Sequence, residues 1–123
     1  MKNNKVGPKF LRFINPLVEV LRLNGGVGRP SEIRPLVTKK LNISEVEINQ
    51  TVGSGVSKIY NQIDWARYYL REWGFISAEE RGIWRLTNKG FKENLTDEQV
   101  LKLFSEVQEK YKKQYKSEKE ETK

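Results

Sequence analysis

The sequence contains no cysteine and no histidine. Without cysteine it has no disulfides and no thiolate ligands for zinc, and without histidine it has no imidazole for metal binding or acid–base catalysis. No carboxylate pair occupies a convincing pocket position either. We therefore predict no metal site, no cofactor and no enzymatic activity. The absence of cysteine also fits a reducing, cytoplasmic location.

Long hydrophobic runs are also absent. The N-terminal stretch "MKNNKVGPKFLRFINPLVEV" is interrupted by Lys9, Arg12, Asn15 and Pro16, so we expect neither a signal peptide nor a membrane span. The chain has 123 residues, of which 37% are hydrophobic. This length and composition predict one domain with a modest core and an appendage.

Acidic residues are fewer than basic residues. The chain has 23 Lys and Arg against 16 Asp and Glu, which gives a net charge of +7. The excess lies in residues 1–43, where Glu19 and Glu32 are the acids and the bases are Lys2, Lys5, Lys9, Arg12, Arg22, Arg29, Arg34, Lys39 and Lys40. A basic surface of this kind favours a polyanionic partner, most often nucleic acid.

Helical spacing of apolar residues begins after a polar, basic arm. It predicts a first helix over residues 10–23, either continuous or broken at Pro16, with Asn15 as a cap candidate. The glycine-rich segment "NGGVGRP" ends this helix. A second helix is predicted over residues 31–41, with Ser31 as its N-cap.

A short helical turn and a long helix follow. Ser44 and Glu47 form a capping box that opens the short turn. The strongest periodicity of the chain then predicts a helix over residues 57–73, and Gly74 ends it. Its apolar stripe consists of Ile59, Ile63, Ala66, Leu70 and Trp73.

The last third of the chain predicts a hairpin and a final helix. Two short β-prone runs in residues 75–86 flank the turn "AEERG", and Thr87 is expected to cap a helical turn after them. Thr96 caps a C-terminal helix over residues 96–115, and residues 116–123 are expected to be a charged tail.

The order of these elements is typical of an α+β winged helix-turn-helix domain. We expect a three-helix core and a two-stranded β-hairpin wing over residues 10–95, with an extra C-terminal helix. Residues 1–9 are expected to form a disordered basic arm.

Several segments are similar to one known family. They are "NPLVEVLRLNGGVGRPSEI", "LNISEVEINQTVGSG" and "NQIDWARYYLREWGFISAEERGIWRLTNKG". Together they resemble the N-terminal domain of the Mrr family of modification-dependent restriction systems, over Phe13–Gly90. The resemblance implies a winged-helix module that binds double-stranded DNA, helps to select methylated DNA and is fused to a nuclease domain. The chain after Gly90 is too short for a nuclease, so we expect a module of a longer protein or a stand-alone binder, located at the nucleoid.

Helix 57–73 is predicted to enter the major groove with its polar face, because recognition helices read base edges there. Asp64 has two alternatives: it reads a cytosine amino group, or it pairs with Lys58, Arg67 or Arg71. The candidates for base contact are Ser57, Lys58, Asn61, Asp64, Trp65 and Tyr68.

The wing and the flanking helices are predicted to contact the DNA backbone. The helix start also offers backbone N–H groups to a phosphate. If six phosphates were engaged, affinity would fall roughly as the fifth power of the salt concentration. The backbone candidates are Arg29, Arg34, Lys39, Lys40, Ser54, Gly55, Tyr60, Arg67, Arg71, Arg81 and Arg85.

The tryptophans have a structural and a functional interpretation. Trp65 and Trp84 could hold a methylated base, since flipped bases stack between aromatic rings. We favour packing instead, with Trp65 beside the first helix and Trp84 on the wing against helix 57–73. Trp73 is expected in the core.

The C-terminal helix carries a heptad-like apolar stripe of Val100, Phe104, Val107 and Tyr111. It either folds back onto the first helix or pairs with a second copy, and we favour the homodimer. Two alternative functions also remain open at this point: a protein-interaction or assembly module, and a transcription regulator that binds an unmodified operator. A nuclease domain or partner protein absent from this chain is the further partner expected.

Overall fold

A computed structural model describes the backbone of residues 7–121 and the side chains of residues 7–114. The first part contains a 3-10 helix η1 (Lys9–Phe13), α1 (Ile14–Leu23), β1 (Val27–Gly28), α2 (Pro30–Lys40) and α3 (Glu45–Ile48). The second part contains α4 (Lys58–Glu72), β2 (Trp84–Arg85), α5 (Asn88–Lys92) and α6 (Asp97–Glu121). No helix in the described part of the chain is both long and apolar enough to cross a lipid bilayer.

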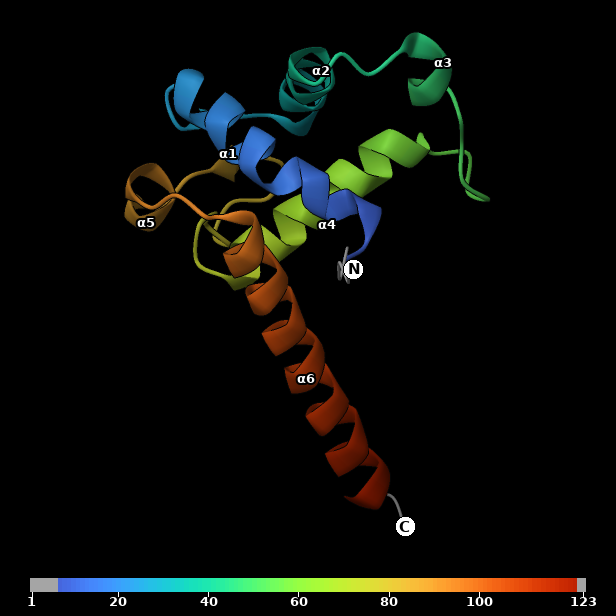
Figure 1. Cartoon of the computed structure of the whole chain (residues 1–123), viewed down its shortest axis with the longest axis vertical. Coiled ribbons are helices and arrows are strands. Elements are labelled where there is room, and N and C mark those ends of the chain that lie inside the picture. Colours follow the sequence, from blue (N-terminus) through green and yellow to red (C-terminus); the bar gives the residue numbers. More distant parts are fainter. Residues whose placement is uncertain (1–6, 122–123) are drawn as a thin grey trace, which may run out of the picture.

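The core lies between α1, α2 and α4. Helix α1 packs against both α2 and α4, and η1 packs along α4 (Figure 1). The apolar faces of the three helices meet because their hydrophobic residues recur every three or four positions. The largest fully buried side chains include Phe13, Leu17, Leu21, Ile33, Ile63 and Leu70. The structure therefore has the α+β architecture of a winged helix-turn-helix domain with an additional C-terminal helix.

The start of the chain differs from the expectation at two helix ends. The first helix is broken between Phe13 and Ile14, not at Pro16, and Asn15 is not its cap: its Nδ2 donates to the carbonyl of Leu95 at 2.9 Å. Helix α2 begins at Pro30 instead of being capped by Ser31. Proline is well suited to the first helical position, because its φ is fixed and it has no N–H to leave unpaired.

The wing is shorter than expected and has an additional partner. Residues 75–77 meet residues 85–87 through a bridge between Ile76 and Leu86, while the strand β2 pairs antiparallel with β1. Strand β1 lies in the segment that was predicted only to end a helix. Two residues are too few to show strand alternation. Gly28 lets β1 pass close to α2, because a Cβ there would lie 2.5 Å from Cδ1 of Ile33.

The side-chain caps predicted at Ser44, Thr87 and Thr96 are confirmed, because each hydroxyl accepts a backbone N–H from the first turn of the helix that follows. The hydroxyl of Ser57 caps α4 in the same way, although no cap was predicted there. At the other end of α4, Gly74 has a φ of 83°, as expected for a glycine that stops a helix. These caps depend on neighbours in the chain and could therefore be identified from local sequence.

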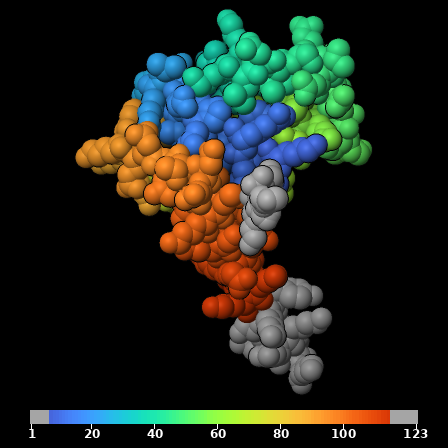
Figure 2. Space-filling view, in the orientation of Figure 1, coloured from blue at the N-terminus to red at the C-terminus, as the bar shows by residue number. Residues whose placement is uncertain are grey.

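Helix α6 continues to Glu121, beyond the end expected at residue 115, and extends away from the body of the domain (Figures 1 and 2). At the N-terminus, residues 1–9 were expected to form an arm. Residues 1–6 lie outside the described residues, and Lys9 is the first residue of η1.

The apolar stripe of α6 folds back onto its own domain. Val100 and Val107 are buried in the common core, and the ring of Phe104 lies 5.9 Å from Phe10 and 5.2 Å from Tyr69. Within this chain the stripe follows the fold-back alternative: Phe104 contacts η1 and α4, and Tyr111 contacts α4. The homodimer through Val100, Phe104, Val107 and Tyr111 stays a prediction.

Candidate functional site

Helix α4 is oriented as its periodicity predicts. Ile59, Ile63, Ala66 and Leu70 are all buried against the other core helices. The opposite face consequently points outward along the whole helix, because residues that differ by about 180° in helical angle lie on opposite sides. The side of α4 that carries the predicted base contacts is therefore the exposed side.

The predicted base-contact residues differ in solvent exposure and in the hydrogen bonds that they already form. Lys58 and Trp65 are exposed, whereas Asn61 and Tyr68 are half-buried. The hydroxyl of Ser57 accepts the backbone N–H of Tyr60 at 3.2 Å, so its first role is to cap the helix. The hydroxyl of Tyr68 forms a hydrogen bond with that of Tyr111. The N-terminal half of the exposed face is thus the part that α6 leaves open.

Asp64 pairs with a residue that the sequence did not suggest. Both of its oxygens accept from the guanidinium of Arg34 on α2, each at 2.8 Å. The expected pairing with Lys58, Arg67 or Arg71 is therefore wrong. Arg34 in turn lies 5.6 Å from the ring of Trp84. The bidentate pair connects the outward face of α4 to α2. It also engages Arg34, which was expected to contact phosphate.

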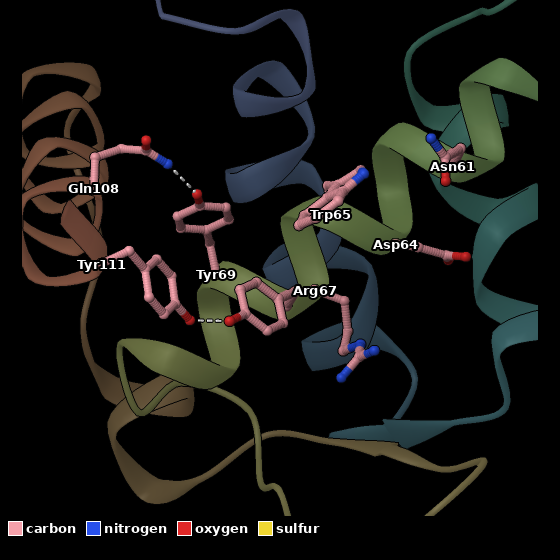
Figure 3. A pocket seen from close by; sticks show the side chains of 8 residues that line it. Asn61, Asp64, Trp65, Arg67, Tyr69, Gln108 and Tyr111 are labelled. Carbon is pink, nitrogen blue, oxygen red and sulfur yellow. Dashed lines mark hydrogen bonds between the residues drawn. The ribbon is translucent and has the colours of Figure 1, made fainter. Parts of the chain in front are cut away.

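An open groove of about 600 Å³ lies between the outward face of α4 and α6 (Figure 3). Aromatic rings line most of it: Trp65, Tyr68 and Tyr69 from α4, and Tyr111 from α6. Asn61 lies at its border, on the open half of α4. In Figure 3 the carboxylate of Asp64 points away from Tyr69, Gln108 and Tyr111. The structure thus brings Asn61, Trp65 and Tyr68 together at one surface.

Two residues of this groove were not predicted as part of a site. Tyr69 is almost fully buried, and its hydroxyl accepts from Nε2 of Gln108 at 2.8 Å. Burial raises the pKa of the Tyr69 phenol, and the bond from Gln108 opposes that rise. The hydrogen bond with Tyr68 raises the pKa of Tyr111 to about 12. Helical spacing from Phe104 would have placed Gln108 on the inner side of α6.

A second hollow, of about 410 Å³, lies on the other flank of α4, between α2 and the wing. Arg67 and Arg71 of α4, Arg34 of α2 and Arg81 of the wing all line it. The side chain of Arg85, also on the wing, is bound by Glu80 at 2.5 Å, as a wing ion pair. Asp64 and Arg67 line both hollows and therefore separate them.

The other backbone candidates do not form one surface. Lys39 and Lys40 line a separate hollow with Leu23 and Leu36, and Lys40 pairs with Glu19 at 3.2 Å. They therefore belong to the side of α2 next to α1. These lysines were predicted as backbone contacts together with Arg34, which is close in sequence but lies on the α4 side of α2.

The start of α4 offers fewer free donors than expected. The N–H of Gly55 donates to the carbonyl of Val52, and that of Lys58 donates to the carbonyl of Gln50, each at 2.8 Å. Gly55 is therefore removed as a backbone N–H donor to phosphate. Ser54 and Arg29 remain exposed, and Tyr60 is half-buried with Arg34 at 6.0 Å from its ring.

The tryptophans follow the packing interpretation. Trp73 and Trp84 are buried, and Trp84 faces the hollow beside α4. Trp65 lies at the edge of the core, with its ring 6.4 Å from that of Phe10 in η1, and 49% of its surface remains exposed. Trp65 and Trp84 line different hollows, so they do not form one aromatic cage.

Comparison with known proteins identifies one family for this chain. The family profile described as the Mrr N-terminal domain matches residues 10–94, which is more than half of the chain. No match was found among curated proteins or among solved structures. The matched range begins in η1 and ends just after α5, so it contains α4, the wing and both strands. The chain therefore belongs to the Mrr N-terminal domain family.

Proposed function

We propose that this chain is a double-stranded DNA-binding module in which α4 enters the major groove and the wing lies on the backbone. Membership of the Mrr N-terminal domain family supports a role in a restriction system. The net charge of +7 supports a polyanionic partner. In this proposal the chain binds DNA at the nucleoid without catalysing a reaction, and a nuclease on another domain or partner performs the cleavage.

One observation carries the proposal: among the described residues, α6 leaves open the polar face on the N-terminal half of α4. Lys58 is exposed there, and Asn61 lies one turn further on the same outward side. Recognition helices read bases with their N-terminal residues, and Asn pairs bidentately with adenine. The C-terminal half is less available, because Tyr68 and Glu72 contact Tyr111 of α6.

We further propose that the module prefers methylated DNA. Asn61 lines the aromatic groove. The ring of Trp65, which is half exposed, lines the same groove. A methyl group added to a base projects into the major groove, where an apolar ring can take it out of water. Trp65 is the residue that combines this position with an accessible aromatic surface.

Fluorescence anisotropy with duplexes of about 20 bp tests the proposal at about 50 mM and about 200 mM salt. Unmodified, adenine-methylated and cytosine-methylated duplexes would be compared. We expect salt-sensitive binding to all three and tighter binding to one methylated form. Asn61→Ala should weaken all binding, whereas Trp65→Ala should remove the methyl preference. Lys102→Gln on α6, away from α4, serves as the charge control.

The other outcomes identify the competing functions. Equal binding to all three duplexes would leave a general DNA anchor and reject the methyl preference. Preference for one unmodified sequence would indicate a transcription regulator. Absence of binding at low salt would reject the DNA proposal and favour an assembly module.

A further inference from the structure

The hollow between α2, α4 and the wing collects more positive than negative charge. We name it the arginine cleft, and the residues that matter to its chemistry are Arg34, Asp64, Arg67, Arg71, Glu80 and Arg81. Four of these carry a positive charge and two carry a negative charge. The cleft is deep enough, at about 410 Å³, to admit a small anionic group together with water.

The carboxylates of the cleft are already paired. Asp64 accepts both of its hydrogen bonds from Arg34, and Glu80 is bound by Arg85, which does not line the cleft. Arg71 has a weaker partner, since its guanidinium lies 3.6 Å from a carboxylate oxygen of Glu72. Arg67 and Arg81 form no ion pair with any described residue within 4.0 Å. The unneutralised charge is therefore on Arg67 and Arg81.

Arg67 is unusual because part of its guanidinium is buried without a partner. Its Nε is one of the buried side-chain atoms that have no hydrogen-bond partner among the described residues. A buried donor left unpaired is costly. Burial, followed by repulsion from Arg71, lowers the pKa of Arg67. An anion that accepts from the Arg67 guanidinium in the cleft would offset both the cost of burial and the repulsion from Arg71.

We propose that the arginine cleft binds one phosphate group, with Arg67 and Arg81 donating to its oxygens from opposite walls. A guanidinium donates two parallel hydrogen bonds to phosphate, and a phosphate has enough oxygens for two arginines at once. The Arg34–Asp64 pair forms the third wall. In this arrangement Arg67 is the principal contact.

The source of the phosphate is a DNA strand, and this assignment rests on the proposed function. The cleft adjoins the outward face of α4 through Asp64 and Arg67, which line both hollows. A backbone phosphate beside a major groove occupied by α4 would lie on this flank. The bound phosphate would then fix the wing relative to α4, so that Arg81 holds the same strand.

Nuclear magnetic resonance of the arginine Nε–Hε groups tests the site directly. Inorganic phosphate and a duplex of about 20 bp would be titrated separately into the full chain. We expect the Arg67 signal to move with both ligands. In parallel, Arg67→Gln should weaken duplex binding about tenfold and lower the salt slope by about one, equally for methylated and unmodified DNA.

Two further variants keep the test interpretable. Arg67→Lys retains the charge but loses the parallel N–H donors of the guanidinium. Compared with Arg67→Gln, it should therefore restore only part of the affinity. Arg12→Gln removes an exposed arginine of η1 that does not line the cleft, and it should leave both readouts unchanged. Circular dichroism of each variant checks that the domain is folded.

The outcomes separate this inference from the proposed function. Duplex binding that is unchanged by Arg67→Gln would overturn the cleft inference and leave the DNA proposal intact. Movement of the Arg67 signal with inorganic phosphate, but no binding of any duplex, would support a phosphate site for a free ligand and overturn its assignment to DNA. No movement with either ligand would overturn the phosphate site altogether.

Discussion

The two flanks of α4 differ in chemistry although they belong to one helix. On the α6 side, the groove of about 600 Å³ is lined mainly by aromatic rings. On the wing side, the cleft of about 410 Å³ is lined by arginines. Asp64 and Arg67 line both of these hollows. A rotation of 100° per residue is enough to separate Trp65 and Tyr69 on one flank from Arg67 and Arg71 on the other.

The difference shows which flank is built for stability and which is suited to a ligand. Tyr69 packs against Phe10, Trp73 and Phe104 with ring centroids 5.2 to 5.9 Å apart, so the aromatic flank attaches α6 to the domain. On the wing flank, the charge of Arg67 has no ion pair among the described residues, so it can be satisfied by an added anion. Changes to the buried Tyr69 should therefore affect folding more than binding, whereas the half-exposed Trp65 stays available to a ligand.

The largest expected effect is on the aromatic flank. Tyr69→Ala removes a ring that is only 4% exposed, and we expect it to lower the free energy of unfolding by about 3–5 kcal/mol. Tyr69→Phe keeps the ring and loses only the bond from Gln108, so it should cost about 1 kcal/mol. Urea denaturation followed by circular dichroism measures both. Equal losses in the two variants would mean that the hydroxyl, not the packing, attaches α6.

A smaller effect is expected at the border between the flanks. Asp64→Asn removes one partner of a pair that remains about a third exposed, so stability should fall by about 1 kcal/mol. Duplex affinity should rise, because Arg34 gains a free charge and a carboxylate no longer faces phosphate. Anisotropy at low and high salt measures the change. Weaker binding by this variant would instead indicate that Asp64 contacts a base or that Arg34 must be held in place.

The wing should affect binding with little effect on stability. Arg81 is exposed, so Arg81→Ala should change the free energy of unfolding by less than about 0.5 kcal/mol. The variant should bind duplex a few-fold more weakly. Arg85→Ala should weaken binding further, because it leaves the carboxylate of Glu80 unpaired beside the cleft. Unchanged affinity in both variants would remove the wing from the proposed interface.

The smallest effect is expected from the phenol of Tyr111 at high pH. Its pKa is raised from 10.0 to about 12 in the folded chain, chiefly by the hydrogen bond with Tyr68. A group with a raised pKa stabilises the fold below its unfolded value, and this contribution is lost as the pH rises towards its folded value. The urea midpoint should therefore fall between about pH 10 and about pH 12, and fall less in Tyr111→Phe. An identical fall in both proteins would assign it to other groups.

Much of the fold could be predicted from local sequence. The helix over residues 57–73, its inward stripe and its stop at Gly74 depend on spacing and on caps within a few residues, and all three agree with the structure. The start of α2 was misplaced because both Ser31 and Pro30 are good candidates at a helix start, and the proline took the first helical position. Strand β1 was missed because two residues carry no readable periodicity.

The candidate site was predicted as a surface but not as a set of contacts. Asn61 and Tyr68 were expected on the outward side of one helix and Trp65 on its flank, and all three line one groove. The partner of Asp64 was wrong because Arg34 lies 30 residues away in the chain, and neither helix period nor charge spacing reaches across two elements. Gln108 and Tyr69 were missed because they meet only when α6 folds back.

The sequence alone determined the helices, their inward faces and the chemistry available on each flank of α4, since these follow from the identity and spacing of neighbouring residues. The tertiary structure alone decided which distant residues meet. It placed Arg34 on Asp64, paired Val27–Gly28 with the wing, and packed the α6 stripe into the core of its own chain. The physical reason is that such contacts depend on how several amphipathic faces share one core, which no single segment of the chain specifies.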